Sequence, residues 1–154
     1  MKALIQRVKR ASVTVGGEEG ESRELLSEIG PGLLILLGVM TDDAEADADW
    51  LAAKCVNMRI FNDDEGVLNR SVRVVDGDII VVSQFTLAAC VKKGNRPSYI
   101  KAARHELAIP LYEYFCAKVS ELLGKRVGTG RFGADMLVSL ENDGPVTIMA
   151  DSRE

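Results

Sequence analysis

Hydrophobic and polar residues alternate along the first part of the chain, as they do in a β-strand with one covered face. This pattern predicts two short strands at residues 4–8 and 11–15, and a further strand at 25–29. Residues 33–39 and 79–82 are apolar without alternation, which indicates strands that are covered on both faces. The central strands therefore need to be covered by helices or by a second sheet, and that second sheet can come from a partner subunit.

The spacing of apolar residues predicts an amphipathic helix at residues 41–58. Thr41 or Asp42 can cap its N-terminus, and the acidic residues of its first turns complement the helix dipole. Cys55 lies on the covered face of this helix, so we interpret it as a core residue and not as a catalyst.

A second helical region is expected at residues 98–123, with Ser98 as its N-cap. Pro110 falls inside this region, and proline lacks the N–H that a helix interior uses. The region is therefore expected to be kinked or split into two helices. Gly124 marks its end, because glycine accepts the left-handed conformation that commonly follows a helix.

Turn-forming residues separate these elements. Asp76-Gly77 lies between apolar segments at 72–75 and 79–82, which is a strong signal for a two-residue β-hairpin. Residues 18–24 are polar and are expected to form an exposed loop. Because most neighbouring strands are joined by such short turns, antiparallel pairing is expected to dominate.

These elements predict an α+β fold. We expect mixed, largely antiparallel β-sheets packed with two main helical regions in β/β/α layers. The length of 154 residues is typical of one domain, so residues 1–154 are expected to form a single unit.

Near the end of the chain, Asn142-Asp143-Gly144-Pro145 interrupts a strand-like pattern that covers residues 136–149. All four residues are turn formers, so the local interpretation is a hairpin turn. The alternative is a dedicated backbone device, because an X–Pro bond adopts the cis form at a cost of only about 0.5–1 kcal/mol. The local sequence leaves both interpretations open.

Composition and charge limit the cellular compartment and the kinds of binding partner that the chain is expected to have. The three cysteines are widely spaced and no signal peptide precedes the first strand, which predicts reduced thiols in a cytoplasmic protein. The net charge of −4 argues against a long nucleic-acid backbone held by bulk electrostatics. The charges are segregated, however: residues 92–104 contain five basic residues and no acidic one, and residues 42–49 show the reverse. The basic run is either solvated surface or a face that approaches phosphate.

The candidate chemistry is concentrated at Ser83-Gln84-Phe85-Thr86, which follows directly on a strand covered on both faces. His105 is the single histidine, and no motif for a metal or a cofactor is present, so neither is expected. The four residues supply two hydroxyls, an amide and backbone N–H groups, none of which is a strong base. They form either a polar strand end or an oxyanion pocket of backbone amides and neutral side chains.

Three segments together resemble the D-aminoacyl-tRNA deacylase (D-tyrosyl-tRNA deacylase) family. They are Ser-Gln-Phe-Thr-Leu at residues 83–87, Gly-Asn-Arg-Pro-Ser-Tyr at 94–99, and the stretch 130–147, which begins Gly-Arg-Phe-Gly and ends with Gly-Pro-Val-Thr. With the opening strands, the resemblance covers essentially the whole chain. The order and separation of the Ser-Gln-Phe-Thr and Gly-Pro motifs are specific, whereas either motif alone would be weak.

The resemblance implies a cytoplasmic homodimeric hydrolase with its active site at the subunit interface and no membrane association. Its substrate would be aminoacyl-tRNA, in which a D-amino acid or glycine is esterified to the 3′-terminal adenosine. In the family the Gly-Pro peptide is cis and enters the other subunit's site, where its carbonyl groups exclude L side chains; these residues match Gly144 and Pro145. Arg7 matches the arginine that holds this segment, and Phe132 and Met136 match the adenosine pocket.

The catalytic roles implied by the resemblance depend on Thr86, which has been regarded in the family as a nucleophile. No base is evident to activate it, and the ribose 2′-OH already activates the neighbouring ester. We therefore expect attack by water with help from the RNA hydroxyl. The N–H groups near Phe85 and Thr86 would stabilise the oxyanion, and Gln84 and Ser83 would position the adenosine.

Two other functions remain to be weighed. Some eukaryotic relatives are reported to bind nucleic acid in DNA replication without enzymatic activity, but a long basic extension would be expected for that role. The other rival is a hydrolase of small acyl esters or amides, and the basic run at 92–104 favours a phosphate-bearing substrate instead. The chain departs from many relatives at residues 88–91, where they carry an aromatic and an acidic residue, and loop 16–26 is longer than typical.

Overall fold

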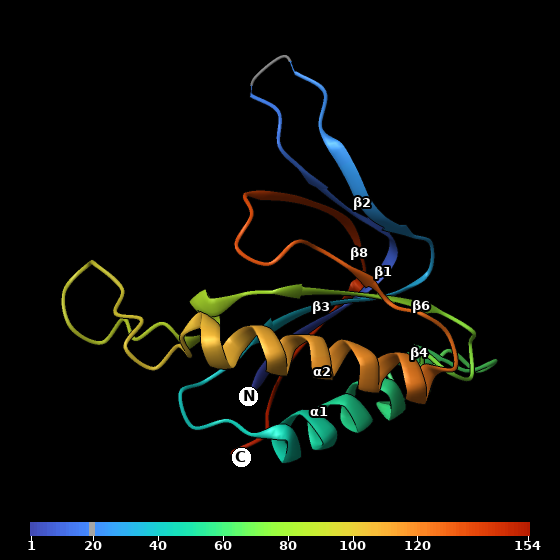
Figure 1. Ribbon diagram of the computed structural model, residues 1–154. Helices are drawn as coiled ribbons and strands as arrows, with labels where there is room; N and C mark the ends of the chain where they lie inside the picture. The colour runs from blue at the N-terminus through green and yellow to red at the C-terminus, as the bar shows by residue number, and fades with distance from the viewer. Residues whose placement is uncertain (19–20) are drawn as a thin grey trace.

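The structure, a computed structural model, describes residues 1–18 and 21–154. The polar loop expected at residues 18–24 includes Glu19 and Gly20, which lie outside the described residues. Strands occupy both ends of the chain and form a sheet, and two helices cover one side of this sheet (Figure 1). Within the described ranges, no helix is long and apolar enough to cross a membrane.

Strand β1 (Lys2–Val15) organises the sheet, because three other strands pair with it. Its first half pairs antiparallel with β3 (Gly32–Gly38), and its second half pairs antiparallel with β2 (Glu24–Ile29). Strand β8 (Met136–Asp151) is antiparallel to β1 and follows its other edge. The two strands expected near the N-terminus are therefore one strand that changes partner in its middle.

The sheet continues through two parallel pairs. Strand β6 (Asp78–Ser83) is parallel to β3, and the short β7 (Gly128–Thr129) is parallel to β6. A separate ribbon is formed by β4 (Phe61–Asn62) and β5 (Leu68–Arg70). The remaining pairings are antiparallel, as expected, but the pairing of β3 with β6 at the centre of the sheet is parallel.

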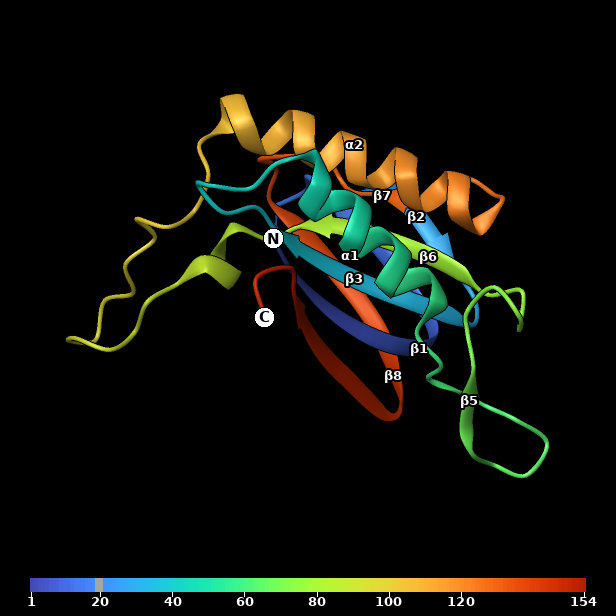
Figure 2. The same cartoon turned by 90° about the horizontal axis from the view of Figure 1, so that it is seen from below.

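Helices α1 (Glu45–Asn57) and α2 (His105–Leu123) pack on one face of the β1–β3–β6 part of the sheet (Figure 2). Side chains on that face, such as Ile35 and Val81, join the helices in the main core. On the opposite face, Leu34 and its neighbours pack against the second half of β1 and the first half of β8. The result is a β/β/α arrangement, which confirms the expected fold class.

Both helices begin later than the sequence indicates. Helix α1 is capped at Ala44, whose N–H donates to Asp47 Oδ2 at 2.9 Å, and not at Thr41 or Asp42. The side chain of Asp43 instead accepts a hydrogen bond of 2.6 Å from the N-terminal ammonium group. The polar residues before the helix are therefore used for tertiary contacts.

Helix α2 begins at His105, so the assignment of Ser98 as its N-cap is wrong. The backbone groups of Ser98 pair with those of Cys90, which prevents a helical turn there. Pro110 lies inside one continuous helix, so the expected split is also wrong. Gly124 ends the helix with φ +81°, as predicted.

The hairpin expected at residues 72–82 is wrong. Val72 is fully buried, and its carbonyl accepts the N–H of Gly77 at 2.9 Å in a local turn. Strand β6 then pairs with β3 and β7, not with the preceding segment. A strand that is apolar on both faces needs a central place in the sheet, and this requirement outweighs the local turn signal.

The Asn142-Asp143-Gly144-Pro145 stretch is not a hairpin turn either. Both of its flanking segments pair antiparallel with β1, so β8 runs on in one direction through a wide bulge. Gln6 pairs with Thr147 and Val8 pairs with Asn142, so residues 143–146 stand opposite Arg7 alone. The Gly144–Pro145 peptide is cis, and Gly144 has φ +120°.

Candidate active site

Strand β6 ends in a tight turn that carries the predicted catalytic residues, and we call Ser83–Thr86 the Thr86 turn. The N–H of Gln84 donates to the Leu37 carbonyl at 2.7 Å, which continues the β3–β6 ladder by one more bond. The chain then enters the 3₁₀ helix Phe85–Ala88. A Cβ placed on Gly38 would lie 3.2 Å from the Gln84 carbonyl oxygen, so the turn packs closely on the end of β3.

The polar groups of the Thr86 turn are arranged without a base. The side-chain amide of Gln84 donates to Thr86 Oγ1 at 2.5 Å, and an amide cannot remove the hydroxyl proton. Among the described residues, no carboxylate or imidazole hydrogen-bonds to this hydroxyl. The N–H groups of Phe85 and Thr86 also have no acceptor within the described ranges, because they open the 3₁₀ helix. Two adjacent free donors are suited to a developing oxyanion.

Phe132 lies beside the same end of β6. Its ring centroid is 5.4 Å from that of His105, edge to face, and 6.0 Å from that of Tyr112. The Tyr112 hydroxyl donates to the Val81 carbonyl at 2.7 Å, two residues before Ser83. Burial raises the pKa of Tyr112, so this phenol stays protonated and keeps the hydrogen bond at neutral pH.

Met136 is the first residue of β8 and directly follows the loop that contains Phe132. Its sulfur accepts the N–H of Arg131 at 3.4 Å and lies so close to Gly130 that a Cβ there would overlap it. Between this loop and α2 lies a hollow of about 370 Å³. Cys116 lines this hollow, but burial raises the pKa of its thiol to about 11, so it offers no thiolate at neutral pH.

The Gly144–Pro145 segment is held from beneath by Arg7, which is almost completely buried. Arg7 Nε donates to the Asp143 carbonyl at 3.2 Å and forms an ion pair of 3.3 Å with its carboxylate. The amide of Asn142 donates to the backbone carbonyls of Arg7 and Val146 and so fixes the base of the bulge. Gly144 and Pro145 themselves are exposed.

One chain does not bring these two groups together. Arg7 pairs with Leu33 on β3, whereas the Thr86 turn is bonded to Leu37, four residues along the same strand. The bulge lies on β8, which is separated from β6 by β1 and β3. At about 3.3 Å per residue and 4.8 Å per strand, the separation is roughly 20 Å. Ser83, Gln84, Phe85, Thr86 and Phe132 therefore gather at one end of the sheet, and Arg7, Gly144 and Pro145 gather elsewhere.

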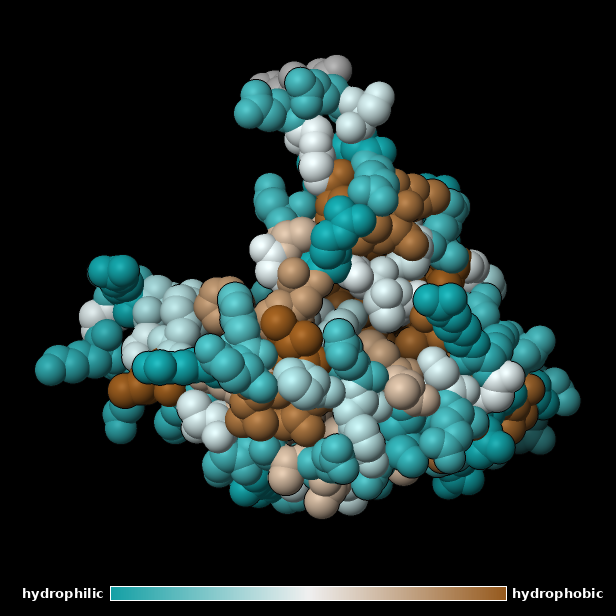
Figure 3. Space-filling view, viewed as in Figure 1, coloured by the Kyte–Doolittle hydropathy of each residue, from teal (hydrophilic) through white to brown (hydrophobic). Residues whose placement is uncertain are grey.

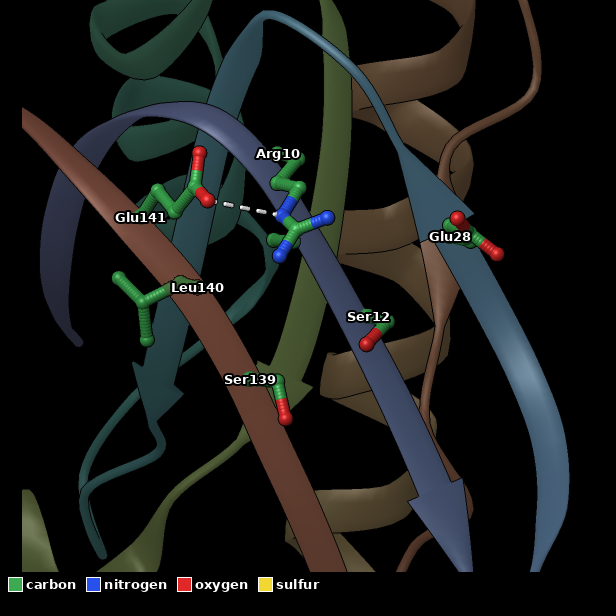
Figure 4. Close-up of a pocket in the computed structure, with 7 residues that line it drawn as sticks. Arg10, Ser12, Glu28, Ser139, Leu140 and Glu141 are labelled. Atoms are coloured by element: carbon green, nitrogen blue, oxygen red, sulfur yellow. Dashed lines mark ion pairs between the residues drawn. The ribbon is translucent and has the colours of Figure 1, made fainter.

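A second hollow lies on the sheet formed by β2, β1 and β8 (Figure 4). Its volume is about 260 Å³, and Ser12, Glu28 and Ser139 are among its lining residues. Arg10 and Glu141 form an exposed ion pair of 3.0 Å across it. None of the predicted site residues lines this hollow, and neither serine hydrogen-bonds to a base among the described residues, so the Thr86 turn is the better candidate.

Sequence reasoning missed three residues of these groups. His105 is an exposed residue at the start of α2, and its ring packs edge to face on Phe132. Tyr99 packs on Phe85, with ring centroids 5.1 Å apart, and Asn142 was grouped only as a turn former. The position of Tyr99 within the resembling segment 94–99 was the one available signal. Within the described ranges, no cluster of three or more His, Cys, Asp or Glu residues could hold a metal ion.

Comparisons with known proteins agree over nearly the whole chain. A family model described as D-Tyr-tRNA(Tyr) deacylase matches residues 4–151. The chain is 58% identical to a D-aminoacyl-tRNA deacylase of Christiangramia forsetii, with coverage of 100% of this chain and 99% of the relative. It is 55% identical to a protein of the same name from Bacteroides thetaiotaomicron, with coverage of 99% and 98%.

Two solved structures share the fold. One is described as the c-Myc DNA unwinding element binding protein and is 41% identical, with a TM-score of 0.87 and coverage of 98% of both chains. The other is described as a probable eukaryotic D-amino acid tRNA deacylase and is 19% identical, with a TM-score of 0.81 and coverage of 97% and 98%. At that lower identity the second structure supports the fold alone.

Proposed function

The chain belongs to the D-Tyr-tRNA(Tyr) deacylase family and is a hydrolase, and on this premise we propose that it cleaves the ester between a D-amino acid, or glycine, and the 3′-terminal adenosine of tRNA. The Thr86 turn carries this proposal. It combines two adjacent N–H donors without an acceptor among the described residues with a hydroxyl whose one hydrogen-bond partner there is an amide. Such a site stabilises negative charge and supplies neither an acid nor a base.

In the proposed reaction, water attacks the ester carbonyl and the ribose 2′-OH relays the proton. The carbonyl oxygen becomes the oxyanion and accepts hydrogen bonds from the N–H groups of Phe85 and Thr86. The bond to the 3′ oxygen then breaks, and that oxygen takes the proton, so the products are the free amino acid and tRNA with its 3′-OH. Gln84 and Ser83 hold the ribose, and the adenine stacks at Phe132 beside Met136.

Chirality is proposed to be read by Gly144 and Pro145 through exclusion. Main-chain carbonyls held near the α-carbon of the substrate leave no room for an L side chain, whereas a D side chain points elsewhere. The roughly 20 Å between this segment and the Thr86 turn of the same chain supports a homodimer in which each site uses the segment of the other subunit. The contacts of buried Arg7 with Asp143 support its role of keeping the segment fixed.

The deciding experiment compares the deacylation of D-tyrosyl-tRNA and L-tyrosyl-tRNA by the purified protein. The proposal requires hydrolysis of the D ester and protection of the L ester, at least about a hundred-fold apart in kcat/KM. Equal rates on both esters, or no hydrolysis of either, would refute it. Tyrosyl ethyl ester serves as a control, because a general hydrolase of small esters would cleave it as fast as the tRNA.

The role of Thr86 is tested by Thr86→Ala. We expect kcat to fall less than about ten-fold, because the N–H groups and the 2′-OH remain in place. A loss of a thousand-fold or more would show that the hydroxyl is the nucleophile. Replacing the terminal ribose by 2′-deoxyribose is the complementary change, and it should reduce kcat far more than the alanine does.

A second candidate function is nucleic-acid binding without catalysis. It is favoured by one observation, the 41% identity to the structure described as the c-Myc DNA unwinding element binding protein. Tight binding of DNA together with no hydrolysis of D-tyrosyl-tRNA would support it.

A further inference from the structure

The segment between the Thr86 turn and α2 carries unpaired positive charge. We call residues 91–104 the basic arm, and its five cations are all exposed. Among the described residues, none of the five forms an ion pair, whereas eight of the other fourteen Lys and Arg residues do. The cations are Lys92, Lys93, Arg96, Lys101 and Arg104.

Backbone hydrogen bonds hold the basic arm against the body of the protein. Cys90 and Ser98 exchange two of them, at 2.8 and 3.0 Å, which closes the outer part of the arm. The Lys101 carbonyl accepts the N–H of Thr41 at 3.1 Å, and the N–H of Ala103 donates to the Val39 carbonyl at 2.9 Å. The arm therefore projects from the end of the sheet where the Thr86 turn lies (Figure 1, left).

Exposed rings lie at the root of the arm. Phe85 and Tyr99 pack edge to face with centroids 5.1 Å apart, and they are 57% and 38% exposed. Ile100 beside them is 82% exposed. Exposed aromatic rings next to cations are the combination with which proteins bind single-stranded nucleic acid, because the rings stack on bases while the cations meet phosphates.

Two acidic residues that precede α1 are paired with other groups and do not neutralise the arm. Asp43 is paired with the N-terminal ammonium group, and Asp42 is paired with Arg153 at 3.4 Å. The arm forms the projection at the left of Figure 3, which is mostly hydrophilic and carries a few hydrophobic residues. Although the chain has a net charge of −4, an approaching polyanion would meet positive charge at this end.

We propose that the basic arm and the Phe85–Tyr99 ring pair bind the unpaired nucleotides that precede the terminal adenosine of the tRNA acceptor end. This proposal rests on the proposed function, which puts the adenosine and its ester at the Thr86 turn. The N–H of Phe85 would face the ester while its ring lies against Tyr99, so the nucleotides just before the adenosine are the ones within reach of the arm. The cations would then contact their phosphates, and the rings their bases.

The test compares two charge-matched double variants. K93A/R96A removes one Lys and one Arg from the arm. K54A/R73A removes one Lys and one Arg elsewhere: Lys54 lies on α1, and Arg73 lies in the turn before β6. Both side chains are exposed, and neither forms an ion pair among the described residues. Each protein is assayed on D-tyrosyl-tRNA and on D-tyrosyl-adenosine, which has the ester but no phosphate.

We expect K93A/R96A to raise KM for D-tyrosyl-tRNA about ten-fold and to reduce the slope of log KM against log salt by about 1.4, since each phosphate contact on a single strand contributes about 0.7. Its kcat/KM for D-tyrosyl-adenosine should stay within about two-fold of the parent value. The kcat/KM values of K54A/R73A for both substrates should also stay within about two-fold of the parent values. Equal losses on both substrates, or an unchanged KM for the tRNA, would overturn the proposal.

Direct binding separates this proposal from the proposed function. An RNA hairpin that carries no amino acid, has a single-stranded CCA end and is labelled with fluorescein at its 5′ end is titrated with the same proteins, and binding is followed by fluorescence anisotropy. Weaker binding by K93A/R96A alone supports the arm, even if no ester is hydrolysed and the proposed function fails. Equal binding by all three proteins, or tighter binding of single-stranded DNA of the same sequence than of the RNA end, would overturn it.

Discussion

At the scale of single residues, the proposed chemistry depends on groups that do not titrate near neutral pH. Among the described residues, the Thr86 hydroxyl hydrogen-bonds only to the Gln84 amide, and the free N–H groups beside it are main-chain donors. Burial raises the pKa of the Cys55 thiol to about 12, which excludes it as a nucleophile and agrees with its place in the core. In the proposed reaction, binding geometry and the 2′-OH of the substrate therefore supply the activation that these side chains do not.

Gly144 is the residue whose replacement tests the exclusion of L substrates most directly. A Cβ there would lie 3.1 Å from Arg7 Nη2 and 2.9 Å from Val146 Cγ2, and φ +120° disfavours any L side chain. We expect Gly144→Ala to lower kcat/KM for D-tyrosyl-tRNA at least about ten-fold, because the segment must shift by a few tenths of an ångström or more. The two kcat/KM values, for D and L esters, are measured together.

The control for this change is Gly66→Ala. Gly66 also has a positive φ, +79°, but a Cβ there meets no atom within 4 Å. Both variants should lose roughly 1 kcal/mol of stability, and only the change at Gly144 should affect catalysis. Similar activity in the two variants would contradict a role for the Gly144–Pro145 segment.

At the scale of elements, the parallel pairing of β3 with β6 positions the Thr86 turn. The pairing begins where Gly32 faces Asp78 and continues to Leu37 and Ser83, just before the turn. A Cβ on Gly32 would overlap the carbonyl of Asp78, so the two strands approach as closely as they do because residue 32 is glycine. The position of the Thr86 turn thus depends on a close approach at the other end of the same pair of strands.

Gly32→Ala is therefore expected to destabilise the protein by about 3 kcal/mol or more, because the backbone of β6 has to move. Urea denaturation followed by circular dichroism measures this change. Gly30→Ala, two residues away, is the matched control, because a Cβ there meets nothing within 4 Å and should change stability by less than about 0.5 kcal/mol. Equal stabilities of the two variants would show that β3 and β6 can separate without cost.

At the scale of the whole molecule, the Gly144–Pro145 segment and the Thr86 turn lie at two separate places on one chain. The bulge on β8 is held on one side of the sheet by Arg7, and the turn is held at the end of β6 by Leu37. A homodimer in which half-sites from two copies combine is the arrangement that the proposed function requires. The exposed surface of Gly144 and Pro145 agrees with that arrangement.

Mixing two defective variants tests the shared site. Thr86→Pro removes the N–H donor at the turn, and Gly144→Ala disturbs the segment, so each protein alone should keep at most about a tenth of the parent activity. After subunit exchange, half of the dimers would be mixed and each would contain one intact site, so the mixture should recover about a quarter of the parent activity. No recovery after exchange, or a fully active monomer of 16.7 kDa in sedimentation, would contradict the shared site.

The sequence by itself determined the elements whose pattern is periodic or repeated over several residues. The two-sided strands, the two helices and the end of α2 at Gly124 follow from hydrophobic spacing and helix-end chemistry, which are local. The residues of the Thr86 turn could also be singled out, since polar residues that follow a buried strand stand out along the chain. The family followed from the same motifs.

Only the tertiary structure decided which local signals were overruled. Asp76-Gly77 and Asn142–Pro145 are both turn signals, but neither forms a hairpin. Strand β6 is buried on both faces and pairs with β3, and both parts of β8 pair with one long strand, β1. Ser98 pairs with Cys90 in place of capping a helix. Pairing partners and distances across a sheet depend on residues far apart in the chain, so no local pattern encodes that Thr86 and Gly144 of one chain lie roughly 20 Å apart.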